Sequence, residues 1–165
     1  IVDNDTGKEV DGQPPGTIQV IVKGGTPSEI AQAIYQEKGT GIRTYGSTSQ
    51  TLFDSKGYEK TIKFSRPVDT PVYATVNIKR LKGSSNDAST YVQDACIAYL
   101  NNTKIGDTIV WSELLGYIAD KVDLISIKSL YIGKTANPTS TEDIVLASAE
   151  KAVATTAGVI VNVLT

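Results

Sequence analysis

The turn at residues 23–26 (KGGT) is one place where residue types and spacing could support chemistry. It lies between an alternating apolar segment and a predicted helix start, where free backbone N–H groups and the helix dipole can hold a phosphate. Neither the G-x-G-x-x-G fingerprint of dinucleotide sites nor the complete P-loop motif occurs in the chain. Thr26, Pro27 and Glu29 instead match a capping box with a proline in the first turn. We therefore expect this turn to cap a helix, and we predict no cofactor.

A second cluster lies near the start of the chain, where five side chains offer oxygen atoms of the kind that calcium prefers: Asp3, Asn4, Asp5, Glu9 and Asp11. Their spacing does not match the EF-hand loop, which ends in a bidentate glutamate. Asp, Asn and Gly are also the residues that turns favour. We interpret the segment as a turn and predict no metal site.

Nucleophilic and acid-base chemistry find little support. The chain has one cysteine and no histidine, which excludes Ser-His-Asp catalysis, Cys-His catalysis and histidine-bearing zinc sites within it. Cys96 falls on an apolar helical face, where a free cysteine behaves as a small hydrophobic side chain. The acidic pair Glu142 and Asp143 has no second carboxylate predicted across a cleft, so we expect a solvated loop. We predict no catalytic residues and no enzyme activity.

Trp111 is the one residue that we single out as a possible interface position. Tryptophan is enriched among the residues that dominate protein-protein binding, so Trp111 could be an exposed anchor for another subunit. It could equally fasten the helix that follows it to the core of its own domain. The sequence leaves both interpretations open.

Composition limits the partners. With 40% hydrophobic and 21% charged residues, the chain can bury a core, and its net charge of -2 comes with scattered basic residues. We therefore predict no nucleic-acid partner, because phosphate binding needs a concentrated basic surface. No apolar run is long enough to span a bilayer, so we predict a soluble protein without membrane association. We also predict no small-molecule substrate. The chain lacks methionine and starts at Ile1, and we expect it to be a fragment.

Periodicity places these residues on helices and strands. Alternation predicts strands at residues 17–23, 51–54, 58–65, 72–79, 124–132, 144–146 and 158–164, and we expect the last strand to be central in its sheet. A first helix should begin at the capping box and end before Gly39, with Ile30, Ala33 and Ile34 on one face. A second should begin at Asn86 or Asp87, and a third should cover residues 112–120.

The order of these elements predicts an α+β fold. We expect two small adjacent domains, at residues 16–82 and 87–165, each a mixed or antiparallel sheet packed by one or two helices. The short polar segment 82–87 (KGSSND) is the predicted boundary. Residues 1–15 are rich in turn residues, and we interpret them as a linker or as the remnant of an upstream domain.

Several phrases of the sequence occur in an order that resembles the baseplate J family of contractile phage tails and related injection machines. In the first half they are residues 16–25 (GTIQVIVKGG), 29–34 (EIAQAI), 41–46 (GIRTYG), and Gly57 leading into 62–67 (IKFSRP). In the second half they are residues 105–107 (IGD), 112–115 (SELL) and Ile118. The resemblance is to the C-terminal portion of that family.

The resemblance implies a structural component of a phage or phage-like tail baseplate that acts in wedge assembly through protein-protein contacts. Its partners would be other baseplate or wedge proteins and copies of the chain itself. Its place would be the virion tail baseplate, assembled in the cytoplasm of the bacterial host from a phage or prophage gene. The alternative is a carbohydrate-binding or host-surface-binding module of a phage tail, which needs a row of exposed aromatic side chains. Six tyrosines are candidates for such a row: Tyr35, Tyr45, Tyr58, Tyr73, Tyr91 and Tyr131.

Overall fold

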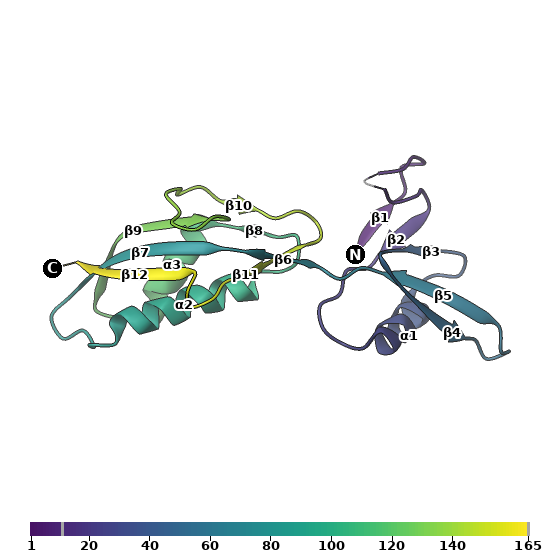
Figure 1. Ribbon diagram of the computed structural model, residues 1–165, viewed down its shortest axis with the longest axis horizontal. Coiled ribbons are helices and arrows are strands. Elements are labelled where there is room, and N and C mark those ends of the chain that lie inside the picture. The colour runs from purple at the N-terminus through teal and green to yellow at the C-terminus, as the bar shows by residue number, and fades with distance from the viewer. Residues whose placement is uncertain (11, 165) are drawn as a thin grey trace. The chain divides into compact units, whose positions relative to one another are not determined.

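The computed structural model describes residues 1–10 and 12–164, and it shows an α+β chain that divides into two compact units (Figure 1). Unit 1 covers Ile1–Pro67 and unit 2 covers Val68–Thr165. Each unit has its own sheets and apolar core, and α1 belongs to unit 1 whereas α2 and α3 belong to unit 2. The α+β class predicted from the sequence is therefore confirmed.

Unit 1 combines a small mixed sheet, a hairpin and one helix. In the sheet, β2 (Thr17–Gln19) lies between antiparallel β1 (Val2–Asn4) and parallel β3 (Arg43–Tyr45). The hairpin pairs β4 (Thr48–Phe53) with β5 (Glu59–Phe64), and the helix is α1 (Pro27–Glu37). The core of unit 1 is small. Among the described residues it contains five buried apolar side chains, all from α1 and β5: Ile30, Ala31, Ile34, Ile62 and Phe64.

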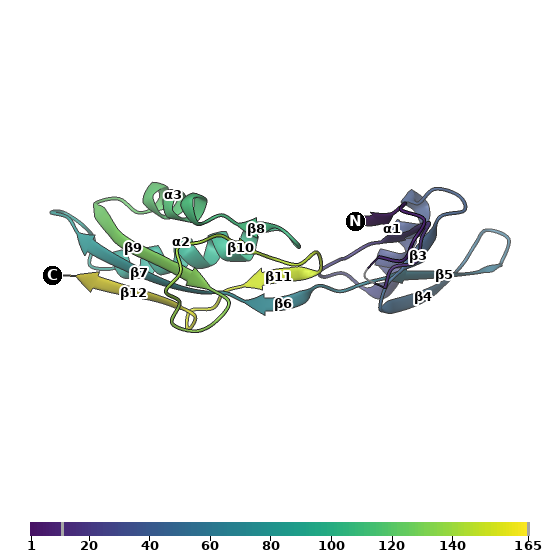
Figure 2. The same cartoon turned by 90° about the horizontal axis from the view of Figure 1, so that it is seen from above.

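Unit 2 is built on a three-stranded sheet in the order β12-β7-β9. The central strand β7 (Tyr73–Arg80) is antiparallel to β9 (Ile125–Gly133) and parallel to β12 (Val159–Leu164). Two short ladders complete the strands: β6 (Val68–Pro71) with β11 (Glu150–Val153), and β8 (Thr108–Ile109) with β10 (Ile144–Val145). The helices α2 (Ala88–Asn102) and α3 (Trp111–Lys121) lie on one side of the three-stranded sheet (Figure 2).

The core of unit 2 forms between that sheet and its helices. Alternate residues of β7, among them Val76 and Ile78, are fully buried and share one core with Leu100 of α2 and Ile118 of α3. Cys96 is also fully buried in this core, as its place on the apolar face of the helix predicts. The other residues of β7, such as Thr75 and Asn77, belong to the second face of the sheet, which no helix of the described residues covers.

The division of the chain differs from the predicted one. Strand β7 lies inside the predicted first domain, residues 16–82, yet it is the central strand of unit 2. Its buried alternating face requires the strands and helices that follow it, so the boundary falls at Pro67 and not at 82–87. The polar segment 82–87 only connects β7 to α2. Residues 1–10 and 12–15 belong to unit 1 and are no linker, because β1 pairs with β2.

Three finer predictions also need correction. The strand predicted at residues 17–23 ends at Gln19, and beyond it only Ile21 makes an isolated bridge, to Ser65. The last strand, β12, lies at an edge of its sheet and not at the centre, because β7 occupies the middle. Helix α2 begins after Asp87 as predicted, but the Asp87 side chain makes no capping hydrogen bond.

Candidate interaction surfaces

The predicted capping turn is built as the sequence indicates. The Glu29 carboxylate accepts the backbone N–H (3.1 Å) and the hydroxyl (2.7 Å) of Thr26, and the Thr26 side chain accepts the N–H of Glu29. The hydrogen bond from the Thr26 side chain is the main reason that the pKa of Glu29 is lowered from 4.5. A carboxylate thus already occupies the helix terminus where a phosphate would bind.

The other side of this turn is held by Arg66. Its guanidinium donates to the carbonyl oxygens of Val22 (3.1 Å), Gly25 (2.8 Å) and Gly24. It also lies 5.4 Å from the ring centroid of Phe64, in cation-π geometry. The guanidinium therefore ties the turn before α1 to the end of β5 through three hydrogen bonds inside unit 1.

The acidic segment near the start of the chain is organised by Asn4, a buried residue. The Asn4 amide nitrogen donates to the carbonyl oxygens of Lys8 (2.8 Å) and Gln13 (2.6 Å), and its oxygen accepts from Thr6. Asp11, one of the five oxygen donors considered for calcium, lies outside the described residues. Among residues 1–10 and 12–164, no cluster of three or more Asp, Glu or Cys side chains is placed to hold a metal ion.

Cys96 is a buried core residue, and Glu142 and Asp143 lie in a loop, where Asp143 contacts the start of α3. Burial raises the pKa of the Cys96 thiol to about 12, so the thiol stays protonated and unreactive near neutral pH. Asp143 accepts the backbone N–H of Trp111 (2.8 Å) and thereby caps the start of α3 from a distant loop. Glu142 is exposed, and its backbone N–H donates to the Ser140 hydroxyl.

Trp111 covers part of the outer edge of β9. Ile132 donates its N–H to the Ser140 carbonyl (2.9 Å), which lies outside the sheet. Because backbone groups alternate in direction along a strand, those of Leu130 also point outward. The Trp111 indole N–H donates to the Leu130 carbonyl (2.9 Å), and the half-buried ring packs on the core. This geometry favours the intramolecular role of Trp111 over that of an exposed anchor.

The edge formed by β12 is open. Ala74 donates its N–H to the Gly158 carbonyl (3.0 Å), and this bond sets which residues of β12 face β7. Val159 faces outward, and its groups bond to Thr155 (N–H to carbonyl, 3.2 Å) and to the Gln93 side chain (2.6 Å). The same alternation turns the backbone groups of Val161 and Val163 outward. In the part of the chain that the structure describes, no strand pairs with this side of β12.

A line of polar side chains crosses the sheet face that carries no helix. Asn162 of β12 donates to the Asn77 side-chain oxygen (2.9 Å), and Asn77 of β7 donates to the Ser129 hydroxyl (2.6 Å) on β9. The line therefore ends at the open edge with Asn162, which is exposed. It orders the polar face of the sheet and leaves the Asn162 amide at the rim.

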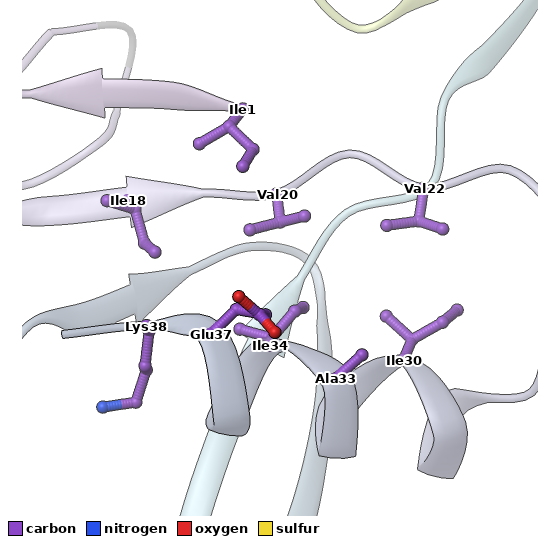
Figure 3. A pocket seen from close by; sticks show the side chains of 9 residues that line it. All are labelled: Ile1, Ile18, Val20, Val22, Ile30, Ala33, Ile34, Glu37 and Lys38. Carbon is purple, nitrogen blue, oxygen red and sulfur yellow. The ribbon is translucent and has the colours of Figure 1, made fainter.

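An apolar groove opens in unit 1 between α1 and the segment that follows β2 (Figure 3). Its volume is about 320 Å³. Val20 and Val22 form one wall. The Ser65 N–H donates to the Val20 carbonyl (2.9 Å) and the Val22 N–H donates to the Ser65 carbonyl (3.0 Å), and these two bonds hold the wall in place. Ile30 and Ile34 form the other wall, together with Ala33, which is exposed and does not reach the core. Glu37 and Lys38 also line the groove, so its lining is mostly but not wholly apolar.

The hairpin of unit 1 carries exposed aromatic residues at its turn, which projects beyond α1 (Figures 1 and 2). Phe53 is 69% exposed and Tyr58 is 64% exposed. The Asp54 carboxylate fixes the turn by accepting the N–H groups of Lys56 and Tyr58 (both 2.9 Å). Of the six tyrosines considered for a glycan-binding row, only Tyr58 and Tyr91 are exposed, and they belong to different units. Sequence reasoning did not single out Phe53.

The surfaces described above are an open strand edge, an apolar groove and an exposed hairpin turn. The titratable groups with shifted pKa values are capping, paired or buried side chains, and no two of them converge on a cavity. No helix within residues 1–10 and 12–164 is long and apolar enough to cross a membrane. The sequence matches no known family model and no curated protein.

Proposed function

We propose that this chain is a structural component of a phage or phage-like tail baseplate, where it acts in wedge assembly through contacts with other chains. The family part of the proposal rests on the ordered phrases that resemble the C-terminal portion of baseplate J proteins. The contact role is carried by one observation, the unpaired and uncharged edge of β12. Exposed strand edges pair readily with other chains, and folds that do not use them normally protect them.

The groove of unit 1 supports the same role. Apolar residues that remain partly exposed in a hollow gain free energy when a neighbouring chain covers them. A partner side chain would lie between Val20 and Ala33, in a groove that Glu37 and Lys38 also line. The proposal needs neither a cofactor nor catalytic residues.

The first test locates the chain in assembled particles. Particles purified from the source phage or prophage are labelled with an antibody against this chain and imaged in negative stain. We expect label at the baseplate end of the tail, and antibody absorbed with the purified chain should give none. Label on fibre tips, or none on intact particles, would overturn the baseplate assignment.

A matched pair of variants tests the groove. Ala33→Glu places a carboxylate among apolar walls, whereas Gln32→Glu adds the same charge at an exposed neighbouring position on α1. In complementation of a phage that lacks the protein, we expect Ala33→Glu to prevent incorporation into particles and Gln32→Glu to leave it intact. Equal incorporation of both variants would exclude the groove as a contact surface.

A carbohydrate-binding or host-surface-binding role is the second candidate, and the exposed hairpin tip favours it. Phe53 and Tyr58 flank a rigid polar turn, and aromatic rings beside polar groups suit sugar recognition. Binding on a glycan array that is lost in Phe53→Ala and Tyr58→Ala, but kept in Tyr91→Ala, would support this role. Absence of binding by the wild-type chain would exclude it.

A further inference from the structure

We propose that β12 pairs with β12 of a second copy of this chain, antiparallel and about a two-fold axis at Asn162, so that two β9-β7-β12 sheets join into one. The inference deepens the proposed contact role by naming one partner and one surface. It rests on that role only in treating the chain as a protein that binds other chains. The baseplate location is a separate question.

Backbone geometry defines what fits this edge. The outward N–H and C=O groups of Val161 and Val163 have no strand partner among the described residues. Groups spaced in this way accept an extended strand and no other regular structure. On the opposite side of the sheet, the Trp111 indole bonds to the Leu130 carbonyl and the Ser140 carbonyl to the Ile132 N–H. The edge of β9 is therefore partly covered, whereas β12 offers the outward groups of Val161 and Val163 to a further strand.

The edge is complementary to itself. In an antiparallel pair, two residues that exchange both backbone hydrogen bonds must each point those groups at the other strand. A two-fold axis at Asn162 places Val161 opposite Val163 of the second copy, and Val163 opposite its Val161. All four of these residues face the contact, so the two copies exchange four backbone hydrogen bonds. An axis at Val161 would lose two of these bonds, because it places Val163 opposite Val159, whose backbone groups already bond to Thr155 and Gln93.

Charge agrees with self-pairing. A two-fold axis brings each residue near its own equivalent, so any charge close to the axis meets a like charge. Strand β12 reads VIVNVL and contains no charged residue, proline or glycine. The hairpin strand β5, by contrast, carries Glu59, Lys60 and Lys63. Ile160 and Val163 are 43% and 42% exposed, which leaves apolar surface for the second copy to cover.

The polar line across the sheet also continues through the axis. Asn162 and its equivalent would form a non-hydrogen-bonded pair, the kind in which opposing side chains lie closest. One N–H of the Asn162 amide goes to Asn77. The second N–H and the side-chain oxygen can make reciprocal hydrogen bonds with the other copy. The line would then run from Ser129 through Asn77 and Asn162 to the same residues of the partner.

Charge swaps at position 162 give the decisive test. The full chain should show a concentration-dependent dimer in sedimentation velocity. Asn162→Lys and Asn162→Asp should each raise the dissociation constant about tenfold or more, because like charges meet at the axis. An equimolar mixture of the two variants should regain the dimer. Unchanged Trp111 fluorescence and circular dichroism would establish that both variants are folded.

A covalent readout tests the register. Asn162→Cys treated with copper phenanthroline should give a disulfide-linked dimer, because opposing Cβ atoms of a non-hydrogen-bonded pair lie close enough to be bridged. Ile160→Cys is the matched control and should cross-link poorly, since it would face Leu164 of the second copy. The native Cys96 is buried and should stay reduced.

A wild-type chain that stays monomeric, or charge variants that do not complement each other, would overturn the pairing. Neither result would move the antibody label from the baseplate, and a dimer without that label would reject the baseplate location alone.

Discussion

The two units obtain their stability in different ways. Among the described residues, unit 2 buries a core of nineteen apolar side chains and unit 1 a core of five, so hydrophobic burial contributes much less to unit 1. Polar side chains that bond to the backbone occur in both units, as Gln93 does in unit 2, but in unit 1 they supplement a much smaller core. Asn4 and Arg66 are examples, and each ties together at least two carbonyl groups. We infer that unit 1 is the more fragile unit.

The unfolding of each unit can be followed separately in solution, because the two intrinsic probes of the chain lie in the same unit. Trp111 is the single tryptophan and Cys96 the single cysteine, and both belong to unit 2. Tryptophan fluorescence and thiol reactivity therefore report the unfolding of unit 2. Amide signals from β4 and β5 in NMR spectra report unit 1.

The largest expected effect comes from Phe64→Ala. Removing this fully buried ring costs about 3–5 kcal/mol, which is close to the roughly 3–5 kcal/mol that a core of this size supplies. We expect the amide signals of unit 1 to collapse to unfolded positions while Trp111 fluorescence and Cys96 protection stay native. Leu130→Ala, the matched change in unit 2, should lower the Trp111 unfolding midpoint and leave both units folded in water. Loss of both probes in Phe64→Ala would mean that the units do not fold separately.

Arg66→Lys should have the next largest effect, again in unit 1. A lysine keeps the charge but cannot reach three carbonyl groups in a fork, and we expect a loss of about 2 kcal/mol. Denaturant titration followed by the unit 1 amide signals measures it. Lys63→Arg, an exposed change in the same strand region, should be close to neutral. Equal stability of the two variants would show that the Arg66 hydrogen bonds do not contribute measurably to the free energy of unfolding of unit 1.

Trp111→Phe tests whether a single side-chain hydrogen bond contributes less to the stability of unit 2 than to that of unit 1. The change keeps an aromatic ring on the core and removes the N–H that satisfies the Leu130 carbonyl. We expect a loss of about 1 kcal/mol, seen as a lower melting temperature of unit 2 by circular dichroism. A loss as large as that for Phe64→Ala would show that unit 2 also depends on single side chains.

The smallest expected effect is a pH dependence of unit 1 through Glu29. Its pKa is lowered in the folded state, so the carboxylate stabilises unit 1 above the ordinary value of 4.5 and stops doing so as the pH falls through the folded pKa. Glu29→Gln should therefore weaken unit 1 at neutral pH and match the wild type in acid. Denaturant titrations of unit 1 at several pH values measure this difference. A difference that persists in acid would assign the effect to packing.

Local features of the fold are readable from the sequence. The capping box at Thr26 and Glu29 fixes the start of α1, and the turn around Gly57 fixes the β4-β5 hairpin. Both depend on residues only a few positions apart, so the pattern contains all the partners. The apolar face that buries Cys96 is readable for the same reason.

Contacts between residues far apart in the sequence could not be predicted from the sequence. Strand β7 alternates clearly, but its parallel neighbour β12 comes from the far end of the chain, so the sequence misplaces both the boundary and the edge. The role of Trp111 depends on which way the Leu130 carbonyl points, which only sheet pairing decides. The Asp143 cap on α3 reaches across 32 positions. Phe53 is missed because exposure at a hairpin tip has no periodic signal.

The parallel pairing of β7 and β12 has a consequence for mechanics. A pull on the carboxyl end of β12 against the amino end of β7 slides the two strands past each other, so the bonds from Val159 to Leu164 are loaded together. Bonds that run across the strands and share a load in this way must break at once, whereas a hairpin opened from its end loses them singly. Unit 2 is therefore built to transmit tension along its strands, and the β4-β5 hairpin of unit 1 would open under a pull at its two ends.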